Sequence, residues 1–398
     1  MRLFLCIAAA VLAAVLPSPA QYRYFAPQGG FAVEVSLENS PYLRLPIYRN
    51  AITSLEVVGD FAIGGTSADP GLSPYLFAVS ISRRRLEAVF PVDQAVPGQQ
   101  SIPGGFGRGP DGALYAGTIA QSKGDSGHLL RVQVNGGRLD VTDLGMPVPS
   151  EGVFAVTADP KADAVYGISY PTGKFFVFHI ADRKTDLYEQ TALDRQMLMR
   201  LKEYVVKPDD VLSRRLVVDG GGRVYGSCPL NRVFRFDPAT KKVEFLESEL
   251  PDVAGRRALG RVDSWAIAPD GTIYGGAAAD GELFRLDPAT GKIANLGKPA
   301  MMPRMKGIAF GRGGQLYGVT GASPGYAHAF TYDLKSGFTD FGNPVVSMKA
   351  EGIEQGIPWR AFQIGTVAAS EDGSYIVMGE EESLSQLIIF PVTGATGR

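Results

Sequence analysis

The sequence predicts an all-β protein whose fold is a seven-bladed β-propeller of four-stranded antiparallel blades. Two observations lead to this prediction. One pattern of short apolar stretches separated by tight turns recurs seven times along the chain. The 398 residues include 49 glycines and 27 prolines, typical of many short strands joined by turns, and a hydrophobic content of 45% is ample for a core. Repeats of this kind cannot bury both faces of one sheet alone, so they stack into a ring.

The clearest copy of the repeat runs from Trp265 to Gly297. Its first apolar stretch ends at Asp270-Gly271, and the second follows at once, because the glycine tolerates the positive φ that a tight hairpin needs. A third stretch alternates apolar and polar residues. The segment from Asp287 to Lys292, Asp-Pro-Ala-Thr-Gly-Lys, is then a turn into a fourth strand. Each copy therefore predicts four strands that meander antiparallel.

The other copies show the same order of strands and turns. Their spacing lies in and somewhat above the range of about 40 to 50 residues found for propeller blades. The last copy ends before a fourth strand, and Phe31–Leu37 near the N-terminus alternates suitably to supply it and to close the ring. The seven copies begin near Phe61, Phe106, Val153, Leu216, Trp265, Ile308 and Val367.

Two insertions interrupt the repeat. Residues 191–213 carry apolar side chains at helical spacing before Pro208, so we expect a surface helix there. Residues 343–363 are expected to form a longer irregular loop.

The N-terminus has the features of a secretory signal peptide in residues 1–20: Arg2, an apolar run, and small residues before Gln21. We expect an exported protein, periplasmic or secreted, with residues 21–398 as a single propeller domain. The apolar run is shorter than the roughly 20 residues of a membrane span, so no membrane partner is expected. Export would leave Cys228 as the one cysteine, and a buried core position is expected for it.

The charge balance argues against nucleic acid as a partner, because 39 basic residues face 41 acidic ones and like charges do not form blocks. The chain has three histidines and no His-x-His pair, so no zinc or other metal site is predicted. No cofactor is predicted either.

The stretch from Tyr166 to Lys174, Tyr-Gly-Ile-Ser-Tyr-Pro-Thr-Gly-Lys, resembles the repeats of exported propellers among bacterial polysaccharide lyases that act on uronate polymers, the ulvan lyase type. The resemblance implies proton transfer by histidine and tyrosine, with arginine neutralising the uronate carboxylate. Lys174 stands where a histidine would match better. With only Trp265 and Trp359 and no Trp-Asp pair, the repeats do not resemble kelch, WD or quinoprotein repeats.

Catalytic residues are predicted on the face of the ring where the loops before the first and third strands open. His128 and His328 take the first position of the third strand in blades two and six, and histidine exchanges protons near neutral pH. Tyr326 precedes that strand in blade six. We expect these three as the catalytic residues of a lyase, the alternative being that the position is a variable, solvated surface site.

Substrate binding is predicted for basic and aromatic residues of the same face. Cations that precede several first strands would converge on one channel mouth and attract an anion. Tyr170 lies where it could stack on a sugar ring. The predicted substrate-binding residues are Arg261, Arg304, Lys306, Tyr170, Lys174, Arg214, Trp359 and Arg360.

The sequence leaves two functions open. The first is binding of an acidic carbohydrate, or another small anionic ligand, at the channel mouth, with a polysaccharide lyase as its catalytic form. The second is a non-catalytic propeller that serves as a scaffold or binds another protein, which the fold alone does not exclude.

Overall fold

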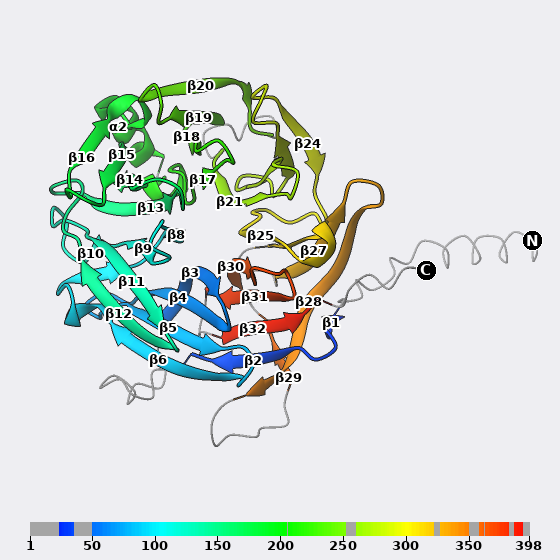
Figure 1. Cartoon of the computed structure of the whole chain (residues 1–398). Coiled ribbons are helices and arrows are strands. Elements are labelled where there is room, and N and C mark those ends of the chain that lie inside the picture. Colours follow the sequence, from blue (N-terminus) through cyan, green and yellow to red (C-terminus); the bar gives the residue numbers. More distant parts are fainter. Residues whose placement is uncertain are drawn as a thin grey trace, which may run out of the picture.

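The strands form seven antiparallel blades arranged in a ring (Figure 1), which confirms the all-β propeller expected from the repeats. The proposed signal peptide and the last two residues of the proposed closing strand, 36 and 37, lie outside the described residues. The computed structural model describes residues 24–35, 50–204, 206–251, 260–321, 327–349, 358–361, 363–381 and 386–392.

In each blade the first strand lies toward the centre of the ring and the last strand toward its rim (Figure 1). Blade one comprises β3 (Asn50–Val58), β4 (Phe61–Ala68), β5 (Tyr75–Ser80) and β6 (Arg85–Pro91). Blade two comprises β8 (Phe106–Arg108), β9 (Leu114–Gly117), β11 (Leu129–Asn135) and β12 (Arg138–Asp143). Blade three comprises β13 (Gly152–Ala158), β14 (Ala164–Tyr170), β15 (Phe175–His179) and β16 (Thr185–Tyr188). Two short strands extend the first sheet at β4, namely β7 (Gln99–Ser101) and β10 (Ile119–Ala120).

The remaining blades follow the same plan. Blade four comprises β17 (Val217–Val218), β18 (Val224–Cys228), β19 (Arg232–Asp237) and β20 (Lys242–Glu249), and blade five comprises β21 (Val262–Ile267), β22 (Ile273–Ala277), β23 (Leu283–Leu286) and β24 (Ile293–Gly297). Blade six comprises β25 (Gly307–Phe310), β26 (Leu316–Thr320), β27 (His328–Asp333) and β28 (Gly337–Lys349). Blade seven comprises β30 (Ile364–Ala369), β31 (Tyr375–Glu380), β32 (Gln386–Pro391) and β2 (Phe31–Glu34).

The N-terminal strand β2 closes the ring, as predicted. It pairs antiparallel with β32, where Ala32 faces Ile388, and so completes blade seven. It also pairs parallel with the far end of β28, where Ala32 faces Met348. Blades six and seven therefore share one continuous sheet, to which β1 (Tyr24–Phe25) and β29 (Pro358–Arg360) add short strands.

The repeated Tyr-Gly pair of the second strands has a packing reason. Tyr166 and Tyr225 of this pair are fully buried between neighbouring blades. The glycine that follows leaves room for a phenylalanine of the third strand: a Cβ on Gly275 would lie 2.1 Å from a ring carbon of Phe284. The pair is thus a packing signature of the blade, because close-packed interiors leave no room for an extra methyl group.

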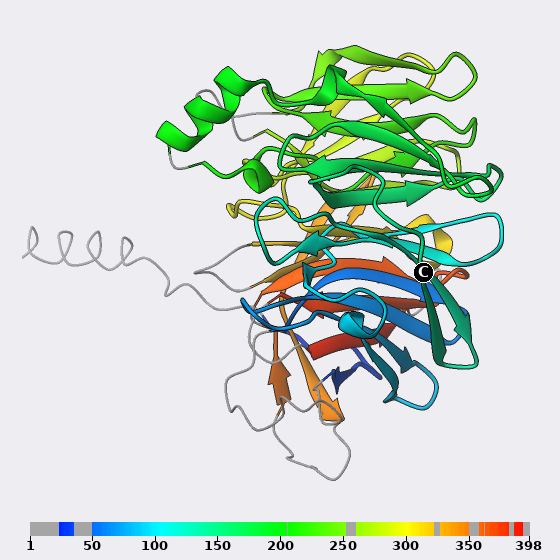
Figure 2. The same ribbon diagram turned by 90° about the vertical axis from the view of Figure 1, so that its left-hand side faces the viewer.

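The insertion at 191–213 contains the expected helix, α2 (Arg195–Glu203), which projects from one face of the ring (Figure 2). Asp194 caps it, its side chain accepting a hydrogen bond from the backbone N–H of Met197 at 2.6 Å. The short 3-10 helix η3 (Pro208–Asp210) follows. Within the described residues, no helix is long and apolar enough to cross a membrane.

The insertion at 343–363 differs from the expected irregular loop at both ends. Strand β28 continues through Asn343 as far as Lys349, and β29 pairs with it. The extension is ordered by β2, which comes from the other end of the chain, so local sequence could not reveal it.

Candidate functional site

A cluster of charged residues occupies the centre of the ring, on the side where the chain enters the first strands. Because the first strands surround the axis, residues just before them converge (Figure 1). This channel cluster consists of Arg214 and Arg215 before β17, Arg261 before β21, Arg304 and Lys306 before β25, and the carboxylates Asp263 of β21 and Glu381 after β31.

Asp263 orients two of the arginines. The Nε–H of Arg261 donates to its Oδ1 at 2.8 Å, and the Nε–H of Arg304 donates to its Oδ2 at 2.9 Å. The Asp263 side chain is 1% exposed and that of Arg261 3%. Burial alone would raise the pKa of Asp263, but the charges of Arg261, Arg304 and Arg214 hold this pKa well below its usual range. Asp263 is therefore a buried anion at neutral pH.

Lys306 and Glu381 form the second ion pair of the cluster. The Nζ of Lys306 donates to Glu381 Oε2, which also accepts from Gln363 Nε2 at 3.1 Å. Arg214 Nη1 lies 3.6 Å from the other carboxylate oxygen. Burial, together with the charges of Arg304 and Arg214, lowers the pKa of Lys306 to about 6. Lys306 therefore changes its charge close to neutral pH.

Arg215 reaches across to blade one, where its Nη2 donates to the carbonyl of Thr53 at 2.9 Å. Its own carbonyl accepts from Trp265 Nε1 at 3.1 Å. Burial lowers the pKa of Arg215 to about 10 and that of Arg261 to about 10. Both arginines still carry their charge at neutral pH.

The cluster offers donors to an acceptor from outside the chain. Two buried guanidinium nitrogens, Arg214 Nε and Arg304 Nη2, have no hydrogen-bond partner among the described residues. A buried donor left unpaired costs about 1 to 3 kcal/mol. The cluster's four arginines outnumber its two carboxylates even when Lys306 is neutral, and the cavity measures about 10 Å³, room for about one water-sized group. One oxygen of a carboxylate or sulfate matches this space and charge.

The backbone at Arg304 is held in the left-handed region, with a φ of 61°. For a residue other than glycine this costs on the order of 1 kcal/mol and is sustained only where the surroundings impose it. Thr320 Oγ1 and the N–H of Gly321 donate to its carbonyl at 3.1 and 3.2 Å. Together with Asp263, these bonds hold the Arg304 guanidinium in the channel cluster.

Beyond the cluster, a cavity of about 380 Å³ continues along the channel and is lined partly by Arg215, Lys306 and Trp265. Glu56 of β3 also lines it. Burial raises the pKa of Glu56, while the charge of Arg108 opposes this shift.

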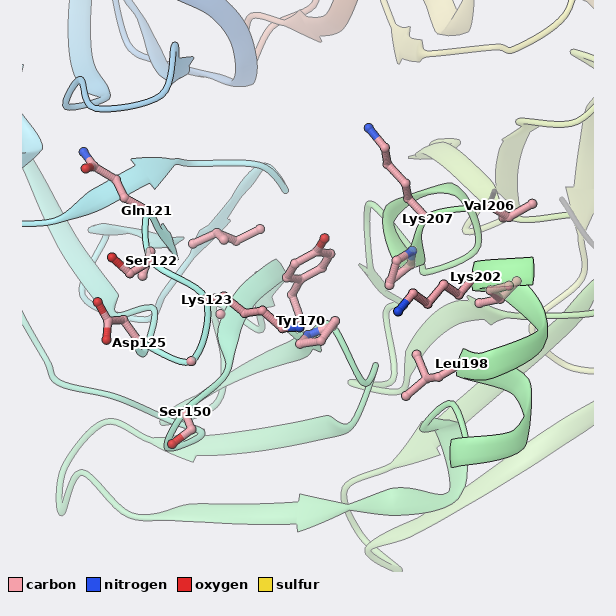
Figure 3. A pocket seen from close by; sticks show the side chains of 17 residues that line it. Gln121, Ser122, Lys123, Asp125, Ser150, Tyr170, Leu198, Lys202, Val206 and Lys207 are labelled. Carbon is pink, nitrogen blue, oxygen red and sulfur yellow. The ribbon is translucent and has the colours of Figure 1, made fainter. Parts of the chain in front are cut away.

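A groove of about 760 Å³ lies beside the cluster, between α2 and the loop after β10 (Figure 3). Tyr170, at the end of β14, lines it and stacks on Phe154 with ring centroids 5.7 Å apart. Apolar lining comes from Ile119, Leu198, Leu201 and Val206, and charged lining from Lys123, Lys202, Lys207 and Asp125. We call this the α2 groove.

The structure brings together four of the predicted substrate-binding residues, Arg214, Arg261, Arg304 and Lys306, in the channel cluster. Their binding of a ligand stays a prediction. Tyr170 lines the α2 groove instead. Lys174 forms an ion pair with Glu151 at 3.0 Å.

The predicted histidines lie outside the cluster. His128 Nδ1 is 2.9 Å from Asp143 Oδ1, and His328 Nδ1 is 3.1 Å from Asp340 Oδ1. Each aspartate also accepts a backbone N–H two residues later, so the two pairs are equivalent contacts between third and fourth strands. These strands are separated from the channel by the first two strands of the blade (Figure 1), and neither histidine lines the cavities described above.

Three further predicted residues cannot be placed as site residues. Tyr326 lies outside the described residues, and for Trp359 and Arg360 the structure describes the backbone of β29 alone. Sequence reasoning missed Glu381, which follows a second strand, where the repeat gives no charge signal. Arg215 shares its position with Arg214 and could have been included. The buried Cys228 matches expectation.

Among the described residues, no group of three or more histidine, cysteine, aspartate or glutamate side chains is placed to hold a metal ion.

The comparisons with known proteins bear on the fold. No family model and no curated protein matches the chain. Among solved structures, it is similar to a streptogramin B lyase, with a TM-score of 0.61 and 11% identity over 91% of this chain and 98% of that one. The fold is that of a β-propeller.

Two other structures lead to the same conclusion. A catalytically inactive virginiamycin B lyase from Staphylococcus aureus with quinupristin gives a TM-score of 0.60 and 10% identity over 92% of this chain and all of that one. The WD40 repeats of RRP9 give a TM-score of 0.56 and 13% identity over 86% of this chain and 95% of that one. At such identities the likeness shows the fold alone, and it does not support the finer resemblance to uronate lyases.

Proposed function

We propose that this propeller is an exported protein that binds an acidic carbohydrate, whose carboxylate or sulfate group enters the channel cluster. The observation that carries the proposal is the pair of buried, unpartnered nitrogens, Arg214 Nε and Arg304 Nη2, within a cluster of net positive charge. Hydrogen bonds from such groups to an anion contribute about 1.5 to 3 kcal/mol each.

The size of the cavity supports entry of the acidic group rather than of a whole sugar. A space of about 10 Å³ admits one oxygen-sized group. The sugar ring would then rest outside the cluster, on the face that carries α2.

A binding measurement tests the proposal. Calorimetry with monomeric galacturonate and with sulfate should show binding by the wild type, and Arg304→Gln should weaken it roughly 10- to 100-fold through loss of a charge-assisted donor. Arg312→Gln is the matched control, because Arg312 lies in the turn at the other end of β25 and pairs with the exposed Asp372. Equal affinity in wild type and Arg304→Gln would move the anion elsewhere.

A lyase is the catalytic form of this proposal. A base would take the proton from the carbon beside the uronate carboxylate, and the electron pair of that C–H bond would form the C=C bond. The glycosidic C–O bond would break, and its electron pair would stay on the leaving oxygen, which is then protonated. Lys306 supports such a step, because a pKa of about 6 leaves its amine largely neutral at pH 7. Incubation with polygalacturonate should then release an unsaturated product that absorbs in the ultraviolet, and Lys306→Met should abolish it.

The non-catalytic scaffold remains the second candidate, and the similarity to WD40 repeats supports the fold it would use. Absence of binding to every acidic sugar tested would favour it over the proposal above.

A further inference from the structure

We infer that the α2 groove is a second subsite, and that the ligand is an acidic polysaccharide chain whose neighbouring unit lies on Tyr170 while one acidic group occupies the channel cluster. The inference rests on the proposed function and extends it from a single acidic group to a polymer.

The shape and chemistry of the groove suit a sugar ring. Tyr170 is fixed from behind by Phe154, so its ring is a rigid platform facing the groove. Figure 3 shows the Tyr170 ring projecting between the loop that carries Lys123 and the helix that carries Lys202. Leu198 and Leu201 of α2 add apolar contact. A volume of about 760 Å³ accommodates a ring that the channel cluster cannot.

The charges of the groove select an anion. Three lysines, Lys123, Lys202 and Lys207, line it against one carboxylate, Asp125. The three lysines are exposed, and none forms an ion pair with another described residue. Lysines placed close together on a concave surface attract a polyanion, because its negative charges reduce the repulsion between the lysines.

The groove and the cluster adjoin through η3. Pro208 lines the groove, and the carbonyl of the next residue, Asp209, accepts a hydrogen bond from Arg261 of the cluster. The groove and the cluster are therefore contacted by consecutive residues of η3. Asp209 and Asp210 also lie near Tyr170, whose pKa is raised first by burial and then by their charges. Because these two carboxylates repel anions, the acidic groups of a chain that spans both sites would lie on the groove lysines and on Arg304.

Chain length is the variable that tests this inference. Calorimetry with galacturonate, its trimer and its hexamer should show affinity that rises at least tenfold from monomer to hexamer in the wild type. Tyr170→Ala should lose roughly threefold to tenfold of that gain while leaving monomer binding unchanged, and Tyr170→Phe should retain it. Lys202→Ala combined with Lys207→Ala should reduce the salt dependence for the hexamer. Tyr204→Ala is the control, because Tyr204 is 78% exposed on the same insertion and does not line the groove.

Each failure points to a different error. Monomer binding that is lost in Arg304→Gln, with no gain for the hexamer, would overturn the groove and leave the proposed function standing. Hexamer binding that depends on Tyr170 but not on Arg304 would leave the groove standing and overturn the channel cluster as the anion site. A neutral hexamer of glucose that binds as tightly as the acidic one would overturn the selection by lysines.

Discussion

Asp263 and Lys306 show how burial and neighbouring charge set the protonation of single residues in this channel. Asp263 has two arginine partners and stays ionised, whereas Lys306 has one carboxylate partner among several cations and is easily neutralised. The same desolvation acts on both residues, and the sign of the surrounding charge decides the outcome.

Replacing Asp263 with asparagine should destabilise the protein, because Arg261 would remain buried without its counter-charge. We expect the free energy of unfolding at pH 7 to fall by about 3 to 5 kcal/mol, measured by urea denaturation.

The pKa of Asp263 in the folded protein is below its value in the unfolded chain. The contribution of Asp263 to the free energy of unfolding is therefore complete above about pH 5 and is lost as the pH falls further. The difference between wild type and variant should shrink in acid. Asp287→Asn in the exposed turn of the same blade is the control, and an equal loss there would contradict the argument.

Anion affinity should depend on the charge of Lys306. A bound anion favours the charged amine and raises its pKa above the free value of about 6, so sulfate should bind most tightly below pH 6. Above pH 6, the affinity for sulfate should fall up to about tenfold per pH unit until the pKa of Lys306 in the bound protein is reached. Sulfate itself does not titrate there. The charged groups facing Lys306 are Glu381, Arg304, Arg214, Asp263 and Arg261. The slope should disappear in Lys306→Gln, and a slope that survives would assign it to another group.

At the scale of the element, the blade is stabilised by the fit between its second and third strands. Phenylalanines of the third strand pack against the glycine of the Tyr-Gly pair, as Phe176 does against Gly167, where an added Cβ would lie 2.2 Å from the ring. The Tyr-Gly pair, which is part of the stretch that resembles lyase repeats, is thus explained by packing within the blade.

Gly275→Ala should disrupt this fit in blade five. The added methyl would overlap Phe284 and force a shift, which typically costs about 1 to 3 kcal/mol. Gly220→Ala is the matched control, because an added Cβ there meets nothing within 4 Å and its φ is not positive. A lower melting temperature for the first variant alone is expected, and equal temperatures would show that Phe284 moves aside freely.

At the scale of the whole molecule, the ring depends on β2, which joins strands from two blades. Val33 is 2% exposed and pairs with Leu387 of β32 and with Lys349 of β28. The closure leaves neither β32 nor the end of β28 as an open edge, and open edges invite aggregation.

Val33→Pro should open the ring. Proline cannot donate to the strand ladder and disfavours a central strand position, so we expect a lower melting temperature and concentration-dependent aggregation in light scattering. Val33→Ala removes apolar area without affecting the ladder and should cost less. If both variants melt together, packing rather than strand pairing accounts for the role of β2.

The repeat by itself determined the number of blades, the order of their strands and the closing strand, because hairpins depend on neighbouring residues: Asp270-Gly271 specifies its own turn. It also placed Arg261, Arg304 and Lys306 before first strands, and a ring brings such positions together. Only the tertiary structure decided that Glu381 joins them from a second strand, that His128 and His328 pair with outer-strand aspartates, and that Tyr170 faces a groove under α2. These contacts join residues of different strands or blades, and their geometry depends on how the strands and insertions pack, which local pattern does not encode.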